Sequence, residues 1–156
     1  MIDRFVIVPA AYVVFLRPTT GEIADAEVLL QLRSGTGYMD DHWATIAGHV
    51  EKGESVFAAA AREAAEEIGV TVAPEALIPL CAMHRTGTGD AIDERVDWFF
   101  STVVWTGDPV VMESTKCADL QWFALNALPD PVVPHERRVL DLVRQGAVPP
   151  ILTHGF

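Results

Sequence analysis

The stretch from Ser55 to Gly69 restricts the fold of this chain more than any other part of it. Serine is a favoured residue at a helix N-cap, and glycine is the usual residue where a helix ends in a left-handed conformation. The residues between them, 56–68, are mainly alanine, glutamate and aliphatic residues, which suit a helix. The pattern therefore predicts a helix over 56–68 with both of its ends defined.

The two sides of this predicted helix differ in character. At about 100° per residue, one side carries three carboxylates and a guanidinium: Glu63, Glu66, Glu67 and Arg62. The opposite side is apolar and is expected to face the core; it consists of Phe57, Ala61, Ala64, Ala65 and Ile68. Ala59 and Ala60 fall on the acidic side, where their small side chains would leave room for a ligand.

The crowding of carboxylates on one side of a helix requires a reason. Like charges one turn apart repel each other by a few tenths of a kcal/mol even when solvated. A hard divalent cation among them would remove this repulsion, because Mg²⁺ takes oxygen ligands and keeps several waters. Taken by itself, the helix leaves two interpretations open: a solvated acidic face, or a metal site.

The residues around the helix complete a longer pattern of nine specified positions across residues 48–70. In order, these positions are Gly48, Glu54, Arg62, Glu63, Ala64, Glu66, Glu67, Gly69 and Val70. The spacing resembles the Nudix box at every fixed position, and only Ala64 departs from the pattern, since it stands where a bulkier aliphatic residue is usual. On this resemblance the chain is identified as a member of the Nudix hydrolase family, with MutT-like nucleotide pyrophosphohydrolases as the nearest group.

The resemblance implies a single Nudix domain over residues 1–156, with the box at 48–70. It also implies an α/β fold, an α/β/α sandwich whose mixed sheet carries the box as a loop–helix–loop. The rest of the chain agrees with this expectation, because strands are predicted at 5–17, 28–32, 43–46, 77–85, 96–105 and 120–123. A second helix is predicted from Pro134 to about Gln145. Regular βαβ spacing is lacking, which favours a mixed sheet.

In the Nudix family the box holds Mg²⁺, with Mn²⁺ as a substitute, against the diphosphate of the substrate. The resemblance therefore implies Glu66, Glu67 and the Gly48 carbonyl as metal ligands. Glu63 would be a further ligand or the general base that deprotonates the attacking water. These roles are physically reasonable, because a bound cation acidifies water and screens phosphate charge.

Two further box residues have an implied positioning role. Arg62 would pair with Glu54, fixing the loop and orienting the catalytic Glu63. A planar guanidinium can hold a carboxylate through two parallel hydrogen bonds, which suits this task.

The family often supplies one more acidic ligand from outside the box. Residues 107–113 are similar to the corresponding segment of MutT-like members, which implies Glu113 as that metal ligand. A solvent-exposed loop glutamate is the alternative interpretation, and Glu94 and Asp97 are rival candidates.

The nucleoside end of the site is less defined by the sequence. In MutT-like proteins, polar residues at the start of the last helix contact the base, and His135 and Glu136 occupy those positions. The alternatives are a surface histidine and a glutamate that favours a helix N-terminus through its charge. Trp43 is a candidate for stacking on the base, together with Tyr38 and Phe99, although core packing is open for each.

The implied activity is Mg²⁺-dependent hydrolysis of the diphosphate linkage of a nucleoside diphosphate derivative. Elimination favours a nucleoside triphosphate, cleaved to the monophosphate and pyrophosphate. Signatures usual for ADP-ribose, dinucleoside polyphosphate and coenzyme A members are missing between Val70 and Phe156 or upstream of the box. A non-catalytic nucleotide-sensing module and a hydrolase of a nucleotide sugar or ADP-ribose-like substrate stay open as alternatives.

The composition of the chain limits the classes of molecule that it is expected to bind. The formal net charge of −11 disfavours nucleic acid polymers and anionic membranes, both of which need basic patches. Apolar runs are too short to cross a bilayer, and residues 1–4 do not begin like a signal peptide. Cys81 and Cys117 are too few for a disulfide framework. We therefore expect a cytoplasmic protein with a small-molecule nucleotide as partner, and a homodimer is left open.

Overall fold

The computed structural model describes residues 4–87 and 94–156. In these parts of the chain, eight strands form one mixed sheet: β1 (Val8–Arg17), β2 (Glu27–Arg33), β3 (Trp43–Ala44), β4 (Ile46–His49), β5 (Ile78–Arg85), β6 (Arg95–Thr102), β7 (Cys117–Ala124) and β8 (Ile151–His154). The main path runs β3-β2-β1-β6-β5-β8, while β4 pairs with β1 and β7 pairs with β2. Because β1 and β6 are parallel and β5 and β6 are antiparallel, the prediction of a mixed sheet is confirmed.

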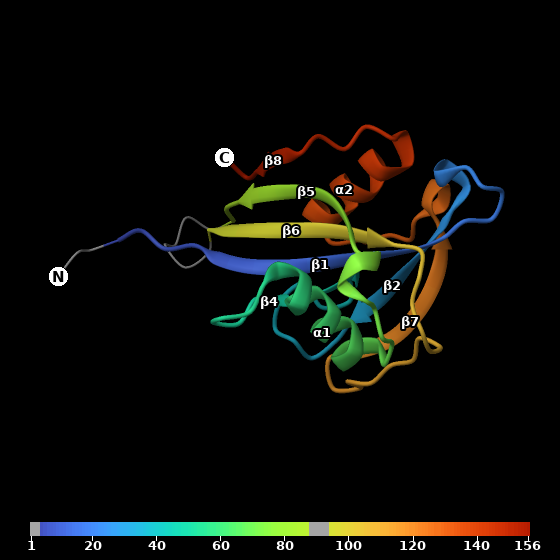
Figure 1. Cartoon of the computed structure of the whole chain (residues 1–156), viewed down its shortest axis with the longest axis horizontal. Helices are drawn as coiled ribbons and strands as arrows, with labels where there is room; N and C mark the ends of the chain where they lie inside the picture. Colours follow the sequence, from blue (N-terminus) through green and yellow to red (C-terminus); the bar gives the residue numbers. More distant parts are fainter. Residues whose placement is uncertain (1–3, 88–93) are drawn as a thin grey trace.

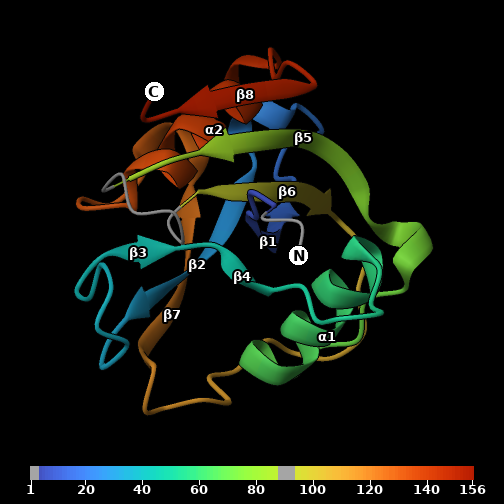
Figure 2. The same ribbon diagram turned by 90° about the vertical axis from the view of Figure 1, so that its left-hand side faces the viewer.

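Two helices cover opposite faces of the sheet, α1 (Val56–Ile68) and α2 (Pro134–Gln145), as Figures 1 and 2 show. Strand β1 lies between the two layers, and its side chains alternate as those of a strand must. The even-numbered positions from Ala10 to Leu16 pack in the core beneath α2, and the odd-numbered ones from Ala11 to Phe15 pack in the core beneath α1. The predicted α/β/α sandwich is therefore confirmed.

The ends of both helices follow from their capping residues. The Ser55 side chain accepts a hydrogen bond from the Ala58 N–H at 3.1 Å, and Gly69 ends α1 at φ 70°. Helix α2 begins at Pro134 and ends at Gly146, whose φ is 65°. Both predicted helices therefore have the bounds that the sequence indicates.

The predicted core face of α1 is wrong in part. Ala59 and Ala60 are fully buried, so they leave no room for a ligand, while Ala65 is exposed. The reason is that α1 packs on β1 and β4 through small residues that permit close approach. Since Ala60, Ala64 and Glu67 are spaced by four and three residues, they share one face, and the buried face therefore includes a box carboxylate.

Other differences lie near the chain's loops and C-terminus. Strand β6 ends at Thr102 instead of continuing to Trp105, and β8 was not predicted. Strand β8 is four residues long and is defined by its parallel pairing with β5, a contact that no local pattern signals. The segment that joins the predicted strands 77–85 and 96–105 includes residues 88–93, which lie outside the described residues. No described helix is long and apolar enough to cross a bilayer.

Candidate active site

A cavity of about 700 Å³ lies beside the box helix. One group of its lining residues is acidic, and we call it the carboxylate cluster: Glu63, Glu66, Glu67 and Glu113. A second group, the polar wall, is formed by Tyr12, Thr45, His135 and Glu136. The two groups come from α1, the loop before β7, strand β1, the residue between β3 and β4, and the start of α2, so the fold assembles residues that are far apart in the chain.

Arg62 holds the box loop against the helix. Its guanidinium donates to both carboxylate oxygens of Glu54, at 2.8 and 3.0 Å. It also donates to the His49 carbonyl at 2.9 Å, to Glu63 Oε1 at 2.8 Å and to Glu66 Oε2 at 3.1 Å. The hydrogen bonds from Arg62 lower the pKa of Glu54 to about 2, so this carboxylate is charged whenever the protein is folded at neutral pH.

Gly48 lies directly against Glu63. A Cβ atom added to Gly48 would stand 2.0 Å from the carboxyl carbon of Glu63, which is far inside van der Waals contact. Burial raises the pKa of Glu63, although the hydrogen bond and charge of Arg62 act in the opposite direction. The close approach explains why the box needs glycine here, and it places the Gly48 backbone beside the carboxylate.

Glu67 is the most enclosed member of the carboxylate cluster. Its Oε2 accepts hydrogen bonds from Gln31 Nε2 at 3.0 Å and from the Ala47 N–H at 3.2 Å. Burial, followed by the charge of Glu63, raises the pKa of Glu67 to about 8. A carboxylate that is costly to ionise alone is expected to favour a nearby cation.

The structure brings Glu113 to the box and keeps its two rivals away. Glu113 lines the cavity and its charge contributes to the raised pKa of both Glu63 and Glu67. Glu94 lies 3.1 Å from His84. Asp97 is fully buried and accepts from Arg85 Nε at 2.7 Å. Neither rival lines the cavity.

The carboxylate cluster is not drawn together around one point. Within residues 4–87 and 94–156, no three His, Cys, Asp or Glu side chains stand close enough to share an ion, because Glu63 and Glu66 turn toward Arg62. The donor set nevertheless fits a divalent cation. It consists of carboxylate oxygens that repel each other, and a hard cation is the partner that such oxygens prefer.

The polar wall contains the two residues predicted at the start of α2. Glu136 Oε1 accepts from both the N–H and the hydroxyl of Thr45, and burial raises the pKa of Glu136 to about 7. His135 Nε2 lies 3.2 Å from the Tyr12 hydroxyl, and burial lowers the pKa of His135 to about 2. Both residues are 4% exposed, so neither is a surface residue.

The three aromatic residues considered for stacking on a base differ in whether they line the cavity. Trp43 packs edge-to-face on Phe123, with ring centroids 4.7 Å apart, and does not line the cavity. Phe99 is buried and stacked on Tyr12. Tyr38 is 48% exposed and lines the cavity, and the Arg33 guanidinium lies 5.5 Å from its ring centroid. Of the three, only Tyr38 lines the cavity, and its side chain is partly exposed.

Sequence reasoning missed Gln31, Thr45 and Tyr12 as site residues. All three lie on or beside strands, where their spacing resembles that of neighbouring core residues. The only available signal was the polar Gln31 inside the apolar run Val28–Leu32, because a buried polar side chain needs a partner.

Positive charge also gathers at the cavity. The chain has eleven Lys and Arg residues, and five of them line it: Arg33, Arg62, Arg85, Arg95 and Lys116. Arg95 Nη1 lies 2.9 Å from His49 Nε2. In a protein of net charge −11, this concentration of cations suits an anionic ligand.

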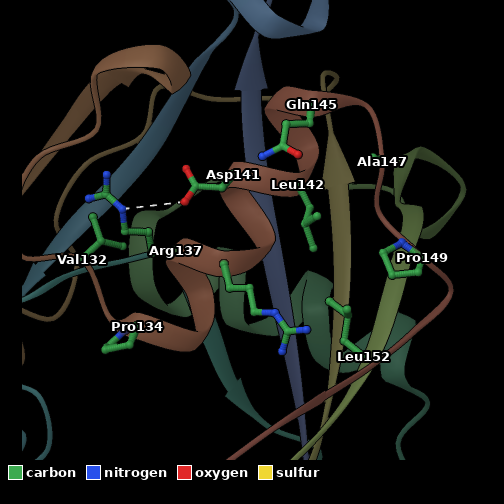
Figure 3. A pocket seen from close by; sticks show the side chains of 10 residues that line it. Val132, Pro134, Arg137, Asp141, Leu142, Gln145, Ala147, Pro149 and Leu152 are labelled. Atoms are coloured by element: carbon green, nitrogen blue, oxygen red, sulfur yellow. Dashed lines mark ion pairs between the residues drawn. The ribbon is translucent and has the colours of Figure 1, made fainter.

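A second cavity, of about 660 Å³, lies on the other side of α2. Figure 3 shows it between the outer surface of α2 and the segment leading to β8, with Arg137 directed toward Asp141. Its lining includes Val132, Leu142 and Leu152. Among the described residues it shares no lining residue with the first cavity, and it has no carboxylate cluster. The first cavity is therefore the candidate site.

Together, the sandwich fold and the carboxylate-lined cavity define an α/β/α protein built to hold an anionic ligand beside clustered acidic side chains. The chain belongs to the NUDIX domain family, whose family model matches residues 7–143. A Bacillus subtilis (strain 168) protein named "Putative 8-oxo-dGTP diphosphatase" is 30% identical over 105 residues. The alignment covers 67% of this chain and 65% of that relative's length.

Solved structures share the fold at lower sequence identity. The MutT NUDIX hydrolase from Burkholderia pseudomallei has a TM-score of 0.75 at 24% identity, covering 87% of this chain and 97% of that one. The NUDIX hydrolase from Nitrosomonas europaea has a TM-score of 0.72 at 20% identity, covering 93% of each chain. The NUDIX domain of Shewanella oneidensis NrtR, solved with ADP ribose, has a TM-score of 0.69 at 16% identity and covers 90% of this chain and 88% of that one.

Proposed function

We propose that this protein, as a single domain over residues 1–156, is a Mg²⁺-dependent Nudix pyrophosphohydrolase of nucleoside diphosphate derivatives. A nucleoside triphosphate, cleaved to the monophosphate and pyrophosphate, is the first candidate substrate. The observation that carries the proposal is the cavity itself, in which the carboxylate cluster and five cations face the same space. Oxygen ligands for a cation and positive groups for phosphates are the two requirements of this chemistry.

The residues that would hold Mg²⁺ are Glu66, Glu67 and the Gly48 carbonyl, with Glu113 close by. When bound, the cation would screen phosphate charge and make water easier to deprotonate. Mn²⁺ is expected to substitute, because it takes the same oxygen ligands.

Glu63 is the proposed general base. Arg62 holds its Oε1, which fixes the direction of the carboxylate, and burial raises the pKa of Glu63, which makes it a stronger base than an exposed glutamate. Water attacks a phosphorus of the diphosphate linkage, its proton passes to Glu63, and the P–O bond to the leaving phosphate breaks.

The polar wall is the proposed nucleoside subsite. Glu136 lines the cavity, and its Oε2 makes no hydrogen bond to any described residue, while its Oε1 is held by Thr45. A buried carboxyl with one unused oxygen is suited to contact a base edge. The exposed ring of Tyr38 is suited to stack on the base, a role that does not suit Trp43, because Trp43 packs on Phe123 and does not line the cavity.

Two alternatives have specific support. The fold is shared with a NUDIX domain that was solved with ADP ribose, which supports an ADP-ribose-like or nucleotide-sugar substrate. A complex with ADP ribose is also what a module that binds a nucleotide without hydrolysing it would form, so a nucleotide-sensing module is the second alternative.

A product-resolved screen separates these functions. The purified protein is incubated with canonical, oxidised and sugar-linked nucleotides in Mg²⁺, and the products are identified by chromatography. Monophosphate plus pyrophosphate from a triphosphate supports the proposal. Release of AMP from ADP-ribose supports the nucleotide-sugar alternative, and tight binding with no turnover of any nucleotide supports the sensing module.

A further inference from the structure

The side chain of Gln31 lies between the carboxylate cluster and the polar wall. It is 8% exposed on β2, and its Nε2 donates to Glu67 Oε2 at 3.0 Å and to the Thr45 carbonyl at 3.3 Å. The carbonyl oxygen can only accept, and a charged carboxylate can only accept. The amide nitrogen must therefore face both partners, and both of its N–H groups are used.

These contacts determine which oxygen of Glu67 is available. Gln31 and the Ala47 N–H both bind Oε2, whereas Oε1 makes no hydrogen bond to any residue in the described parts of the chain. The two donors therefore fix the plane and direction of the carboxylate and leave Oε1 for a cation.

Thr45 extends the connection to the polar wall. Its carbonyl accepts from Gln31, while its N–H and hydroxyl donate to Glu136 Oε1. Glu67, Gln31, Thr45 and Glu136 thus form one hydrogen-bonded chain that joins α1 to α2 through β2 and the residue between β3 and β4. Thr45 and Glu136 are 1% and 4% exposed, and in a close-packed interior a shift at one member is felt by the next.

We propose that Gln31 is a positioning residue that presents Glu67 Oε1 to the cation, and that Thr45 couples this residue to Glu136 in the nucleoside subsite. The identities of the cation and the nucleotide rest on the proposed function. Under this proposal, contact of a base with Glu136 and binding of the cation at Glu67 support each other, since such coupling is reciprocal.

The first test compares Mn²⁺ binding without nucleotide, measured as free Mn²⁺ by electron paramagnetic resonance. Gln31→Met keeps an unbranched side chain of similar length and removes both donors. We expect it to weaken Mn²⁺ binding by about 10-fold or more, the usual effect of losing an outer partner of a metal ligand. The matched control is Gln121→Met, because Gln121 is exposed on β7 and its side chain, among the described residues, bonds only Asp119. Equal Mn²⁺ affinity in the wild type and Gln31→Met overturns the positioning role.

Thermal melting establishes whether Gln31→Met folds. If it does not, Gln31→Asn serves as the second variant, since it keeps an amide but shortens the side chain by one methylene. Gln31→Asn is expected to weaken Mn²⁺ binding in the same direction, and wild-type affinity in this variant contradicts the proposal.

The coupling is tested by kinetics with the nucleotide selected in the screen. At saturating Mn²⁺, Gln31→Met should lower kcat while KM stays within about threefold, since it acts through a metal ligand. The loss of kcat/KM in Gln31→Met/Glu136→Gln should be smaller than the product of the two single losses. In the control double variant Gln121→Met/Glu136→Gln, the loss of kcat/KM should equal the product of the two single losses. A multiplicative result for both pairs removes the link through Thr45.

The proposed function and the inference about Gln31 can be contradicted independently of each other. A wild-type protein that hydrolyses no nucleotide contradicts the proposed function, while the Mn²⁺ comparison still decides the role of Gln31. An active wild type with equal Mn²⁺ affinities contradicts only the inference about Gln31.

Discussion

Glu67 lies where a helix normally places an aliphatic residue. It shares the buried face of α1 with Ala60 and Ala64, and its pKa is raised to about 8 by burial and by the charge of Glu63. Such placement is unfavourable for the fold unless a partner compensates the charge. At the scale of single residues, the proposed site is therefore a place where stability and function conflict.

The substitution Glu67→Gln separates the effect of this side chain on stability from its effect on turnover. The amide has nearly the same shape and cannot ionise, so it avoids the cost of a buried negative charge, and the melting temperature without metal should stay the same or rise. Turnover should fall by more than the 10–100-fold typical of outer partners, because a ligand itself is lost. The measurements are melting in chelator and initial rates in Mg²⁺. Wild-type turnover would show that the metal site lies elsewhere.

Gly48→Ala tests the contact with Glu63. The added Cβ would lie 2.0 Å from the Glu63 carboxyl carbon, so the carboxylate must move, and we expect kcat to fall by at least about 10-fold through misplacement alone. Gly87→Ala is the control, since no atom of the described residues lies within 4 Å of a Cβ there. Equal rates for both variants contradict a role for this close approach.

The raised pKa of the buried Glu136 carboxyl predicts that the stability of the protein depends on pH. Its pKa rises from the ordinary 4.5 to about 7 on folding because the carboxyl is buried. The folded state then binds more protons than the unfolded state between these values, so stability falls as pH rises from about 4.5 to 7 and levels off above. In chelator, urea unfolding should show this loss, on the order of a few kcal/mol. In Glu136→Gln the loss should be smaller, and an unchanged profile would contradict the assignment.

At the scale of elements, α1 is held to its preceding loop by one side chain. Arg62 makes five hydrogen bonds to four residues of the loop and helix. A lysine keeps the charge but cannot reproduce a planar fork of donors. The positions of Glu63 and Glu66 therefore depend on the guanidinium and not only on its charge.

Arg62→Lys should consequently lower kcat by about 10–100-fold with a smaller change in KM. Arg144→Lys provides the control, since Arg144 lies in the last turn of α2, away from the cavity. Initial rates over a range of nucleotide concentrations give both parameters. Full activity in Arg62→Lys would show that charge alone suffices.

The elements also show where sequence interpretation succeeds and fails. The ends of α1 were predicted from Ser55 and Gly69, because capping depends on residues a few positions apart. The prediction for the buried face of α1 is right for Ala64 and Ile68 and wrong for Ala59, Ala60 and Ala65, because it takes the apolar side of the helix as the buried side. In the structure, the close contact with β1 and β4 selects small residues such as Ala59 and Ala60 and turns Glu67 inward with them.

At the scale of the whole molecule, the fold collects opposite charges around one cavity. Six carboxylates and five cations from separate elements line it, and the chain as a whole is acidic. Repulsion within the carboxylate cluster acts against folding when no cation is present, since the charges of neighbouring carboxylates contribute to the raised pKa of Glu63 and of Glu67.

Mg²⁺ should therefore stabilise the whole domain. A ligand present at 100 times its dissociation constant adds about 2.7 kcal/mol, which corresponds to a rise in melting temperature of several °C for a domain of this size. Differential scanning calorimetry with Mg²⁺ and with chelator measures the shift. The shift should be much smaller in Glu67→Gln, and chelator should abolish turnover until Mg²⁺ is restored. A melting temperature that is the same with Mg²⁺ and with chelator contradicts a cation site in this cavity.

What the sequence by itself determined is local: two helices with their ends, most strands, and the spacing that identifies the family. These features depend on residues close together in the chain, whose propensities and capping preferences can be read directly. The tertiary structure decided which face of α1 is buried, that Glu113 and Tyr38 reach the cavity while Trp43 does not, and that Gln31 and Thr45 join its two groups. Those outcomes depend on how strands and helices distant in sequence pack against each other, and no spacing within a single element encodes that packing.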